Sequence, residues 1–300
     1  MTFVLISSYA PSFLNFRKEL IKSIIAKGHD VVLLAPDFDS YSKSVLKNMG
    51  AKTSDIELIR SGTNLIREIK SFLSVYKAIS SISPDIVMTY TIKPVIYGSF
   101  AAYLCKVPKI CSLITGLGHS FLSKSFKGRL LNLLVRNLYS ISLSINYSVL
   151  FQNKDDRKLF LDLKIIKDIE KTHVVNGSGV NVDYYHQTQL PDSAVFLLIA
   201  RLIKEKGILE FIEASNRLCY KYPNVQFNIV GGFDDQPTSL NQKDLDVLTH
   251  SSNIKFTGAV EDVRKNIAEA SIFVLPSYRE GTPRSVLEAM SMGRPIITTD

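Results

Sequence analysis

The 300 residues exceed one ordinary domain and suit two domains of about 150 residues each. With 46% hydrophobic and 21% charged residues, the composition is globular and excludes a low-complexity chain. The net charge of +8 is uneven, because residues 1–150 carry 18 Lys and Arg against 8 Asp and Glu, and residues 151–300 carry 18 against 20. A basic first half indicates an anionic partner: nucleic acid, anionic lipid or a phosphorylated substrate.

Short apolar runs alternate with amphipathic helical patterns through the first half of the chain. Near-continuous apolar strands between helices are typical of a parallel sheet covered on both faces. The predicted strands are 2–8, 29–36, 52–56, 85–90, 109–115, 148–153 and 172–176, and the predicted helices are 12–27, 64–82, 94–105 and 121–146.

A turn-rich connector, "NGSGVNVDYY" at 176–185, interrupts this alternation, which then restarts. The second series predicts strands at 194–201, 225–232, 253–258, 271–276 and 295–299, and helices at 205–221, 239–249, 261–269 and 283–292.

The two series predict two Rossmann-like, doubly wound α/β domains, at 1–176 and 191–300, joined by a linker at 177–190. Ligands of such domains bind at the carboxyl ends of the strands, so we expect these ends to face each other across a cleft. The chain stops on the strand "RPIITTD", where a covering helix normally follows. We therefore expect a C-terminal part of the second domain to be missing from this sequence.

The stretch "YREGTPRSVLEAMSMG", 278–293, places a carboxylate on each side of a predicted helix start. Thr282 is the expected N-cap and Pro283 the first helical residue. Glu280 and the Gly281 and Thr282 amides then lie beside a helix N-terminus, which favours anions. Glu288 projects from the same helix near this rim.

Carboxylates at these positions are suited to accept hydrogen bonds from sugar or ribose hydroxyls. One glutamate would hold a sugar and the other a ribose, with a diphosphate between them. The alternative is a surface helix in which Arg284 and Glu288 form an i,i+4 pair.

A second stretch, "IARLIKEKGILEF" at 199–211, gathers cations where a strand passes into a helix. Cations are unfavourable at a helix N-terminus unless something negative is bound there. The Arg201 guanidinium can donate two parallel hydrogen bonds to a diphosphate, and the Lys206 ammonium offers it a compact positive charge. Both would stabilise the charge on a departing nucleoside diphosphate. The alternative is a loop of solvated side chains, for Lys204 above all.

Two further strand ends carry candidate residues. Gly231, in "IVGGFDD" at 229–235, would let the backbone approach a ligand, or would serve an ordinary turn. His119, in "ITGLGHSF" at 114–121, would act as a general base or contact a phosphate or hydroxyl, or would be structural.

Two signatures of other enzyme classes are missing. The chain has no Gly-x-x-x-x-Gly-Lys phosphate loop, and "SSYAPSF" follows the first strand in place of Gly-x-Gly-x-x-Gly, which argues against a dinucleotide oxidoreductase. The Asp-x-Asp pair at 37–39 follows a predicted strand, and the pair at 244–246 lies in a predicted helix. We therefore expect neither pair to bind a metal.

Taken together, these motifs resemble family 4 retaining glycosyltransferases of the two-Rossmann GT-B type, over essentially the whole sequence. The shared motifs are Glu-x7-Glu in "REGTPRSVLE", Arg-x4-Lys-Gly in "RLIKEKG", "VGG", "GSGVN" and "FVLPSYREG". Within that family, "TIKPVIYGSFAAYLCKVPKICSLITGLG", 91–118, is similar to bacterial capsule and O-antigen transferases, which add a sugar from a UDP donor to a sugar on undecaprenyl diphosphate.

The resemblance implies roles for individual residues, together with retention of anomeric configuration and no metal or other cofactor. Arg201 and Lys206 would bind the diphosphate, Glu280 and the amides after it the donor sugar, and Glu288 the ribose. The implied catalytic group is Arg201, Lys206, Glu280 and His119, and the implied donor-binding group is Gly231, Gly281, Thr282, Val286 and Glu288. The first loop departs from many relatives, since Tyr9-Ala10-Pro11 replaces Gly-Gly, and Thr115 stands where many carry His.

The segment 121–142 mixes basic residues with Phe and Leu, as an amphipathic helix on anionic headgroups would. With the basic first half, this predicts binding to an anionic membrane surface. The resemblance to capsule and O-antigen transferases implies that this surface is the inner face of a bacterial plasma membrane, where the protein would be peripheral, and that nucleic acid is no partner. The alternative is a core helix whose polar face is basic.

Two other functions are compatible with this architecture. One is an isomerase similar to UDP-N-acetylglucosamine 2-epimerase, although the first half has few acidic residues for that chemistry. The other is a non-catalytic partner of a polysaccharide assembly complex. For the transferase, the family analogy favours N-acetylgalactosamine as the donor sugar, and galactose next.

Overall fold

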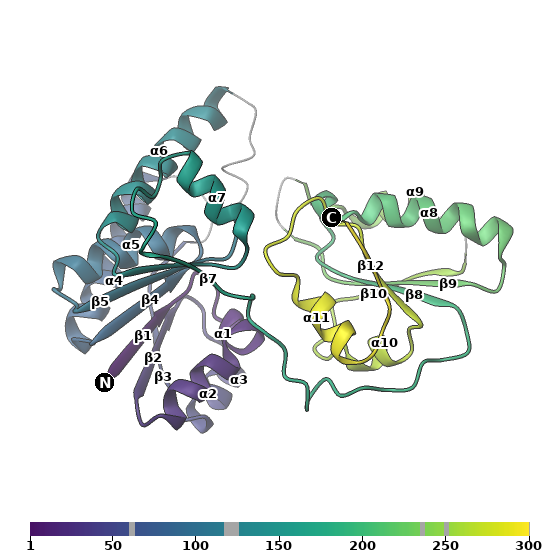
Figure 1. Cartoon of the computed structure of the whole chain (residues 1–300), viewed down its shortest axis with the longest axis horizontal. Coiled ribbons are helices and arrows are strands. Elements are labelled where there is room, and N and C mark those ends of the chain that lie inside the picture. Colours follow the sequence, from purple (N-terminus) through teal and green to yellow (C-terminus); the bar gives the residue numbers. More distant parts are fainter. Residues whose placement is uncertain (60–63, 117–125, 235–237, 249–251, 300) are drawn as a thin grey trace. The chain divides into compact units, whose positions relative to one another are not determined.

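The computed structural model describes residues 1–59, 64–116, 126–234, 238–248 and 252–299 (Figure 1). The chain divides into two compact units, Met1–Ser178 (unit 1) and Gly179–Asp300 (unit 2), so the division falls inside the predicted 177–190 linker. Each unit is a parallel sheet with helices on both faces, which confirms the predicted α/β class with two doubly wound domains.

Unit 1 is built on seven parallel strands in the order β3-β2-β1-β4-β5-β6-β7. The strands are β1 Thr2–Ile6, β2 Asp30–Ala35, β3 Lys52–Asp55, β4 Ile86–Tyr90, β5 Lys109–Ile114, β6 Ser148–Phe151 and β7 Thr172–Val174. The helices are α1 Pro11–Phe16, α2 Lys18–Ala26, α3 Ser40–Asn48, α4 Leu65–Ile82, α5 Ile92–Leu104, α6 Phe126–Ser144 and α7 Lys154–Asp162.

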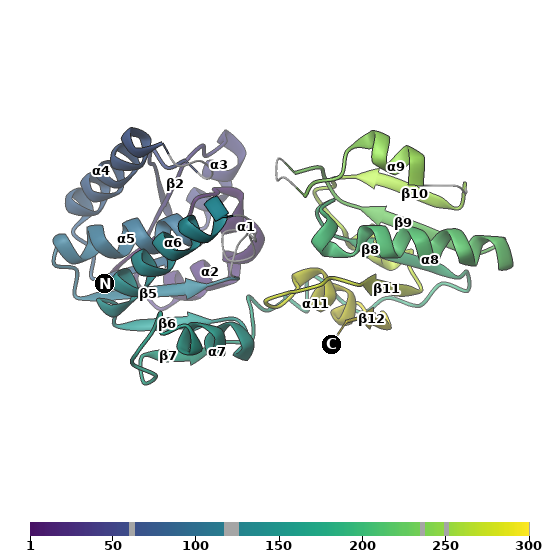
Figure 2. The ribbon, with the colours of Figure 1, turned by 90° about the horizontal axis from the view of Figure 1, so that it is seen from above.

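Successive side chains of the central strands enter two separate cores, one on each face of the sheet. Val4 and Ile6 of β1 pack with residues of α4 and α5, whereas Leu5 packs with residues of α1, α2 and α3. Figures 1 and 2 show these two helix layers. Because both faces are buried, the strands have the near-continuous apolar sequences that predicted a parallel sheet.

The single helix predicted at 12–27 is in fact two helices, α1 and α2. Arg17 between them leaves the helical conformation (φ −124°, ψ 2°). Its guanidinium is buried, with its carbon 4.9 Å from the centre of the Tyr90 ring. The break therefore brings a cation against Tyr90, the last residue of β4.

Helices α3 and α7 have no counterpart among the predicted elements. Each begins with a side-chain cap, since Asp39 accepts from the Ser42 amide at 2.7 Å and Asn153 from the Asp156 amide at 2.6 Å. Each buries only two residues, so its apolar periodicity is too weak to predict a helix.

Unit 2 is built on five parallel strands in the order β10-β9-β8-β11-β12. They are β8 Val195–Ile199, β9 Gln226–Val230, β10 Ile254–Gly258, β11 Ile272–Leu275 and β12 Ile296–Thr298. A 3-10 turn, Lys204–Lys206, leads into α8 Ile208–Lys221, and the other helices are α9 Gln242–Leu248, α10 Arg264–Ala268 and α11 Arg284–Ser291. Leu198 and Leu197 of β8 enter cores on opposite faces.

The later part of the predicted linker is packed onto unit 2. Tyr185 lies in the core that contains Phe273, and the Arg294 guanidinium donates to the carbonyl oxygens of Thr188 at 2.6 Å and Ala270 at 2.9 Å. Residues 185–188 are therefore an integral part of unit 2. Among the described helices of both units, none has the length and apolar character needed to cross a bilayer.

Candidate active site

The strand order of unit 2 reverses beside β8. From β8 the chain adds β9 and β10 on one side and then β11 and β12 on the other, so β8 and β11 are neighbours that start opposite halves of the sheet. At such a reversal the loops after the two strands diverge and leave a crevice at their carboxyl ends. The predicted motifs with Arg201 and Lys206 follow β8, and the motif with Glu280 follows β11.

Lys206 and Glu280 form an ion pair across this point. Lys206 ends the 3-10 turn after β8, and Glu280 lies in the loop between β11 and α11; their side chains are 20% and 22% exposed. The structure thus brings together two predicted site residues that are 74 positions apart. Both are partly shielded, which strengthens their electrostatic interactions, but remain open to a solute.

Backbone contacts fix the two loops that carry this pair. The Tyr278 amide donates to the carbonyl oxygen of Glu205 at 3.0 Å, and the Ser277 hydroxyl donates to the same oxygen at 3.0 Å. Gly207 follows with a φ of +71°, and a Cβ there would lie 2.0 Å from the carbonyl oxygen of Pro276. Only glycine permits this close approach, so the Lys-Gly part of the motif has a structural reason.

Arg201 lies in the same loop after β8 as Lys206 and is paired with a residue that the sequence did not single out. Its guanidinium is 2.6 Å from a carboxylate oxygen of Asp234, in the loop after β9. Arg201 is about half exposed (49%) whereas Asp234 is 14% exposed. Asp234 belongs to the quoted "IVGGFDD" stretch, but pairing across 33 positions leaves no periodic signal in a sequence.

Gly231 has a structural role that was not predicted. A Cβ at this position would lie 1.8 Å from the carbonyl oxygen of Ala200, so the glycine allows the backbones at the ends of β8 and β9 to approach. Its predicted contact with a ligand stays a prediction.

Glu288 is paired within α11 and is buried. Its carboxylate accepts a hydrogen bond from the Arg284 Nε at 2.7 Å, which is the i,i+4 pair given above as the alternative. It also accepts a hydrogen bond from the Tyr185 hydroxyl. The helix is not a simple surface helix, however, because only 8% of Glu288 is exposed. Burial raises the pKa of this carboxyl, and the neighbouring Arg284 cation and Tyr185 hydrogen bond oppose the shift.

The predicted N-cap of this helix is wrong. The N-cap is Pro283, whose backbone is extended (φ −70°, ψ 114°), and α11 begins at Arg284 rather than at Pro283. No side-chain cap hydrogen bond is present among the described residues, since a proline side chain has no acceptor. Thr282 and Gly281 therefore lie in the loop before the helix, where their predicted contacts with a donor stay predictions.

The two remaining candidates are placed differently. The Val286 side chain is buried in the core with Phe273 and Ala289, so a donor contact at this position would have to come from the backbone. His119 lies outside the described residues, and its role stays a prediction.

Unit 1 has a strand-order reversal of its own, between β1 and β4. Here the Ser8 and Thr91 hydroxyls lie 2.9 Å apart, and Thr91 has a left-handed φ of +70°. Beneath them the Tyr90 hydroxyl is hydrogen-bonded to Ser12 at 2.9 Å, and burial raises the pKa of Tyr90 to about 12. This polar cluster lies next to the unusual first loop, 9–11, and was not predicted.

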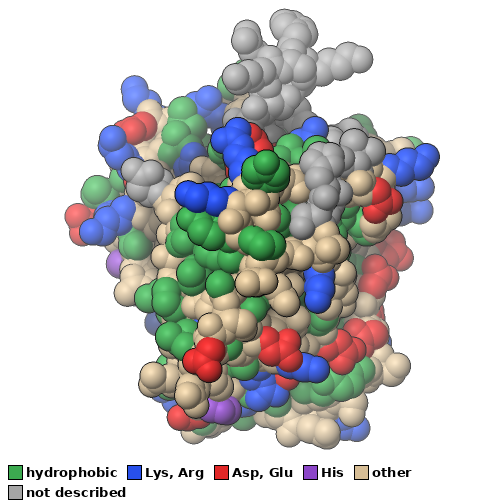
Figure 3. Space-filling model, turned by 90° about the vertical axis from the view of Figure 1, so that its right-hand side faces the viewer, with side chains coloured by type: hydrophobic (Ala, Val, Ile, Leu, Met, Phe, Trp, Pro, Cys, Tyr) green, Lys and Arg blue, Asp and Glu red, His purple; other side chains and the backbone are tan. Residues whose placement is uncertain are grey.

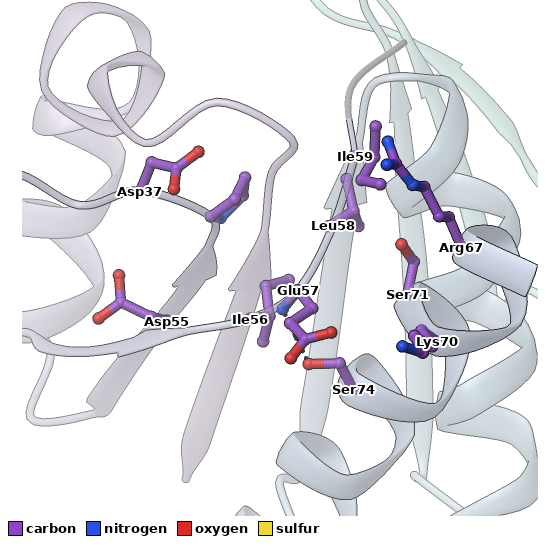
Figure 4. A pocket seen from close by; sticks show the side chains of 11 residues that line it. Asp37, Asp55, Ile56, Glu57, Leu58, Ile59, Arg67, Lys70, Ser71 and Ser74 are labelled. Atoms are coloured by element: carbon purple, nitrogen blue, oxygen red, sulfur yellow. Dashed lines mark hydrogen bonds between the residues drawn. The ribbon is translucent and has the colours of Figure 1, made fainter. Parts of the chain in front are cut away.

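A pocket of about 760 Å3 opens in unit 1 between the carboxyl ends of β2 and β3 and the first turns of α4 (Figure 4). Asp37 and Asp55 lie on one side, and Arg67 and Lys70 of α4 on the other. None of these residues was predicted to bind anything. Within the described ranges, no group of three or more His, Cys, Asp and Glu side chains is arranged to hold a metal ion.

Comparison with known families assigns both halves of the chain. Residues 5–153 match the family model of glycosyl transferase 4-like proteins, and residues 193–300 match the model of glycosyl transferases group 1.

Two curated relatives are similar over most of the chain. An N,N'-diacetylbacillosaminyl-diphospho-undecaprenol alpha-1,3-N-acetylgalactosaminyltransferase of Campylobacter jejuni is 27% identical over 81% of this chain and 66% of its own length. A UDP-Gal:alpha-D-GlcNAc-diphosphoundecaprenol alpha-1,3-galactosyltransferase of Escherichia coli is 25% identical over 79% of this chain and 63% of its own length. The chain thus spans slightly less than two thirds of these curated relatives.

Solved structures with the same fold cover nearly the whole chain. Sucrose-phosphate synthase of Thermosynechococcus elongatus superposes with a TM-score of 0.76 at 15% identity, over 99% of this chain and 81% of the other. HepE of Anabaena, in complex with UDP and glucose, superposes with a TM-score of 0.74 at 16% identity, over 99% and 80%. With the two family models and the two doubly wound units, these similarities show that the chain belongs to the family 4 glycosyltransferases with the GT-B fold.

Proposed function

We propose that this protein is a retaining glycosyltransferase that moves a sugar from a UDP-sugar to a saccharide linked to undecaprenyl diphosphate, in the synthesis of a capsule or O-antigen polysaccharide. The observation that carries the proposal is the pairing of Lys206 with Glu280 at the β8–β11 reversal, with Arg201 in the same loop after β8 and paired with Asp234. The names of the two curated relatives, both of which act on diphospho-undecaprenol-linked sugars, support the acceptor class.

The ion pairs of the site suggest how the donor binds. A diphosphate entering the crevice brings negative charge that competes with the carboxylates of Glu280 and Asp234 for Lys206 and Arg201. Once Lys206 turns to the phosphate, the Glu280 carboxylate becomes available to accept hydrogen bonds from the donor sugar. Binding therefore exchanges internal ion pairs for contacts with the ligand.

The same two cations account for catalysis without a metal ion in our proposal. When the glycosidic bond breaks, negative charge develops on the departing UDP. Arg201 and Lys206, already positioned by the turn after β8, stabilise that charge more than they stabilise the ground state. Glu288 accepts the ribose hydroxyls from within α11, and His119 acts on the acceptor or contacts a phosphate.

The donor sugar is N-acetylgalactosamine or galactose in this proposal. The C. jejuni relative is named as an N-acetylgalactosaminyltransferase and the E. coli relative as a galactosyltransferase. The enzyme would work as a peripheral protein at the inner face of a bacterial plasma membrane, where its lipid-linked acceptor lies.

The proposal predicts that Glu280→Ala and Lys206→Ala each lower the rate of sugar transfer by about a hundredfold or more, because each removes a group that contacts the donor in the transition state. The measurement is UDP release and labelled lipid product with membrane acceptor and UDP-N-acetylgalactosamine or UDP-galactose. The control is Lys265→Ala on α10, whose side chain is 85% exposed and is paired with Glu269 at the end of the same helix.

Equal activity of wild type and both variants would remove the transferase assignment. Conversion of the UDP-sugar into an isomer without acceptor would establish the 2-epimerase alternative, and no turnover of any donor with an intact acceptor would favour the non-catalytic one.

A further inference from the structure

Helix α4 carries a stripe of large apolar side chains that no described part of the protein covers. Leu65, Ile66, Ile69 and Leu73 are between 45% and 73% exposed, although they occupy the first half of a helix whose other face is buried. At 100° per residue these four positions span about 100° of the helix circumference. Single exposed apolar residues are ordinary, but four adjacent ones form a continuous patch that indicates a partner.

Basic side chains border this apolar stripe along one edge. Arg67, Lys70 and Lys77 are exposed and occupy about the next 80° of the circumference. Two of them, Arg67 and Lys70, also line the pocket shown in Figure 4. The cations therefore lie between the stripe and the pocket.

The acidic residue of α4 does not offset these cations at the surface. Glu68 turns toward α5, where its carboxylate accepts from the Lys93 ammonium at 2.6 Å and from the Tyr97 hydroxyl at 2.6 Å. Its side chain is only 18% exposed. The solvent face of α4 thus presents apolar side chains and positive charge, but no negative charge.

We propose that α4 is the surface with which unit 1 lies on an anionic lipid bilayer. Leu65, Ile66, Ile69 and Leu73 enter the boundary between headgroups and acyl chains, and Arg67, Lys70 and Lys77 contact the lipid phosphates. The inference rests on the proposed function, since a lipid-linked acceptor brings the enzyme to such a surface. It is consistent with the charge of the chain, because residues 1–150 carry the entire positive excess.

This assignment differs from the membrane segment expected from the sequence, 121–142. In the part of α6 whose side chains are described, 132–144, Arg136 is the only Lys or Arg, and its guanidinium donates to the carbonyl oxygen of Leu163 at 3.3 Å. Leu133, Leu134 and Ile141 are exposed in this part of α6, whereas Lys124, Lys127 and Arg129 of the expected segment lie outside the described side chains. Figure 3 shows a face of unit 2 that carries both basic and acidic side chains, so this face offers an anionic bilayer no field of one sign.

The test measures co-sedimentation of the full chain with phosphatidylcholine vesicles, with and without phosphatidylglycerol, at low ionic strength. The apolar variant is Leu65→Ser/Ile66→Ser/Ile69→Ser, and its matched control on α6 is Leu133→Ser/Leu134→Ser/Ile141→Ser. The charge variant is Arg67→Gln/Lys70→Gln/Lys77→Gln, and Arg217→Gln/Lys221→Gln/Lys265→Gln in unit 2 removes the same charge elsewhere. All twelve positions are exposed, so the variants should fold, which circular dichroism checks.

We expect the wild type to bind vesicles that contain phosphatidylglycerol and each α4 variant to bind at least about tenfold more weakly, with both controls close to wild type. No binding by the wild type, or equal losses in the controls, would overturn the inference. So would a dimer in light scattering that dissociates in the apolar variant, since a second copy would then cover the stripe.

UDP binding, measured without vesicles, separates this inference from the proposed function. A chain that binds UDP but no vesicles retains the function and loses the membrane surface. A chain that binds vesicles through α4 but no UDP-sugar loses the function and retains the surface.

Discussion

Charged residues of the candidate site in unit 2 are held in ion pairs, and in the proposed function a ligand exchanges two of these pairs. Lys206 is paired with Glu280, Arg201 with Asp234, and Arg284 with Glu288. In each pair, at least one of the two residues was predicted from the sequence to belong to the site. The Arg284–Glu288 pair is the i,i+4 pair that the sequence offered as an alternative. The sequence could not show the other two pairings, because Asp234 and Glu280 reach their partners only through the order of strands in the sheet.

Glu288 makes the fold of unit 2 sensitive to pH. Burial raises its pKa in the folded state above the value of about 4.3 expected in an unfolded chain. As the pH rises from about 4.3 to the higher pKa of the folded state, the Glu288 carboxyl loses its proton first in the unfolded state. The wild type should therefore lose stability in this pH range relative to Glu288→Gln, whose side chain does not ionise.

Urea unfolding of both proteins between pH 4 and pH 7 measures the difference in free energy of unfolding. A wild type that gains stability relative to Glu288→Gln with rising pH would show that the Arg284 pair outweighs burial.

At the scale of the elements, predictions were most accurate where both faces of a strand are buried. The apolar runs of β1, β2, β8 and β11 carry this signal, whereas α3 and α7 are short, mostly polar and held by N-caps. The Pro283 N-cap shows the same limit, since helix boundaries depend on single dihedral angles that composition does not set.

The close approach of β8 and β9 predicts different effects for two adjacent glycines. Gly231→Ala should lower the free energy of unfolding by about 2 kcal/mol or more, since its Cβ would lie 1.8 Å from the Ala200 carbonyl oxygen. Gly232→Ala should cost less, because its Cβ would meet only the Ala259 Cβ, at 3.3 Å. Urea unfolding of the two variants checks the contrast, and equal effects would mean that the two backbones separate at no cost.

For the whole molecule, fold and family could be predicted from the sequence because the signals are spread over the entire chain. Two parallel sheets, two family models and motifs at three strand ends all agree.

The exposed face of α4 could not be predicted as a surface, because the same apolar residues are equally typical of a buried helix. Only the burial pattern shows that Leu65 and Ile69 are outside while Val75 and Ile79 are inside.

The central claim is that unit 2 binds a nucleoside diphosphate through Arg201 and Lys206 at the end of β8. Calorimetric titration of the full chain with UDP, in buffer containing EDTA, tests it most directly. We predict saturable binding that Arg201→Ala and Lys206→Ala each weaken by about tenfold or more, while Lys265→Ala leaves it unchanged. No heat of binding from the folded wild type, or binding that both site variants retain in full, would contradict the claim.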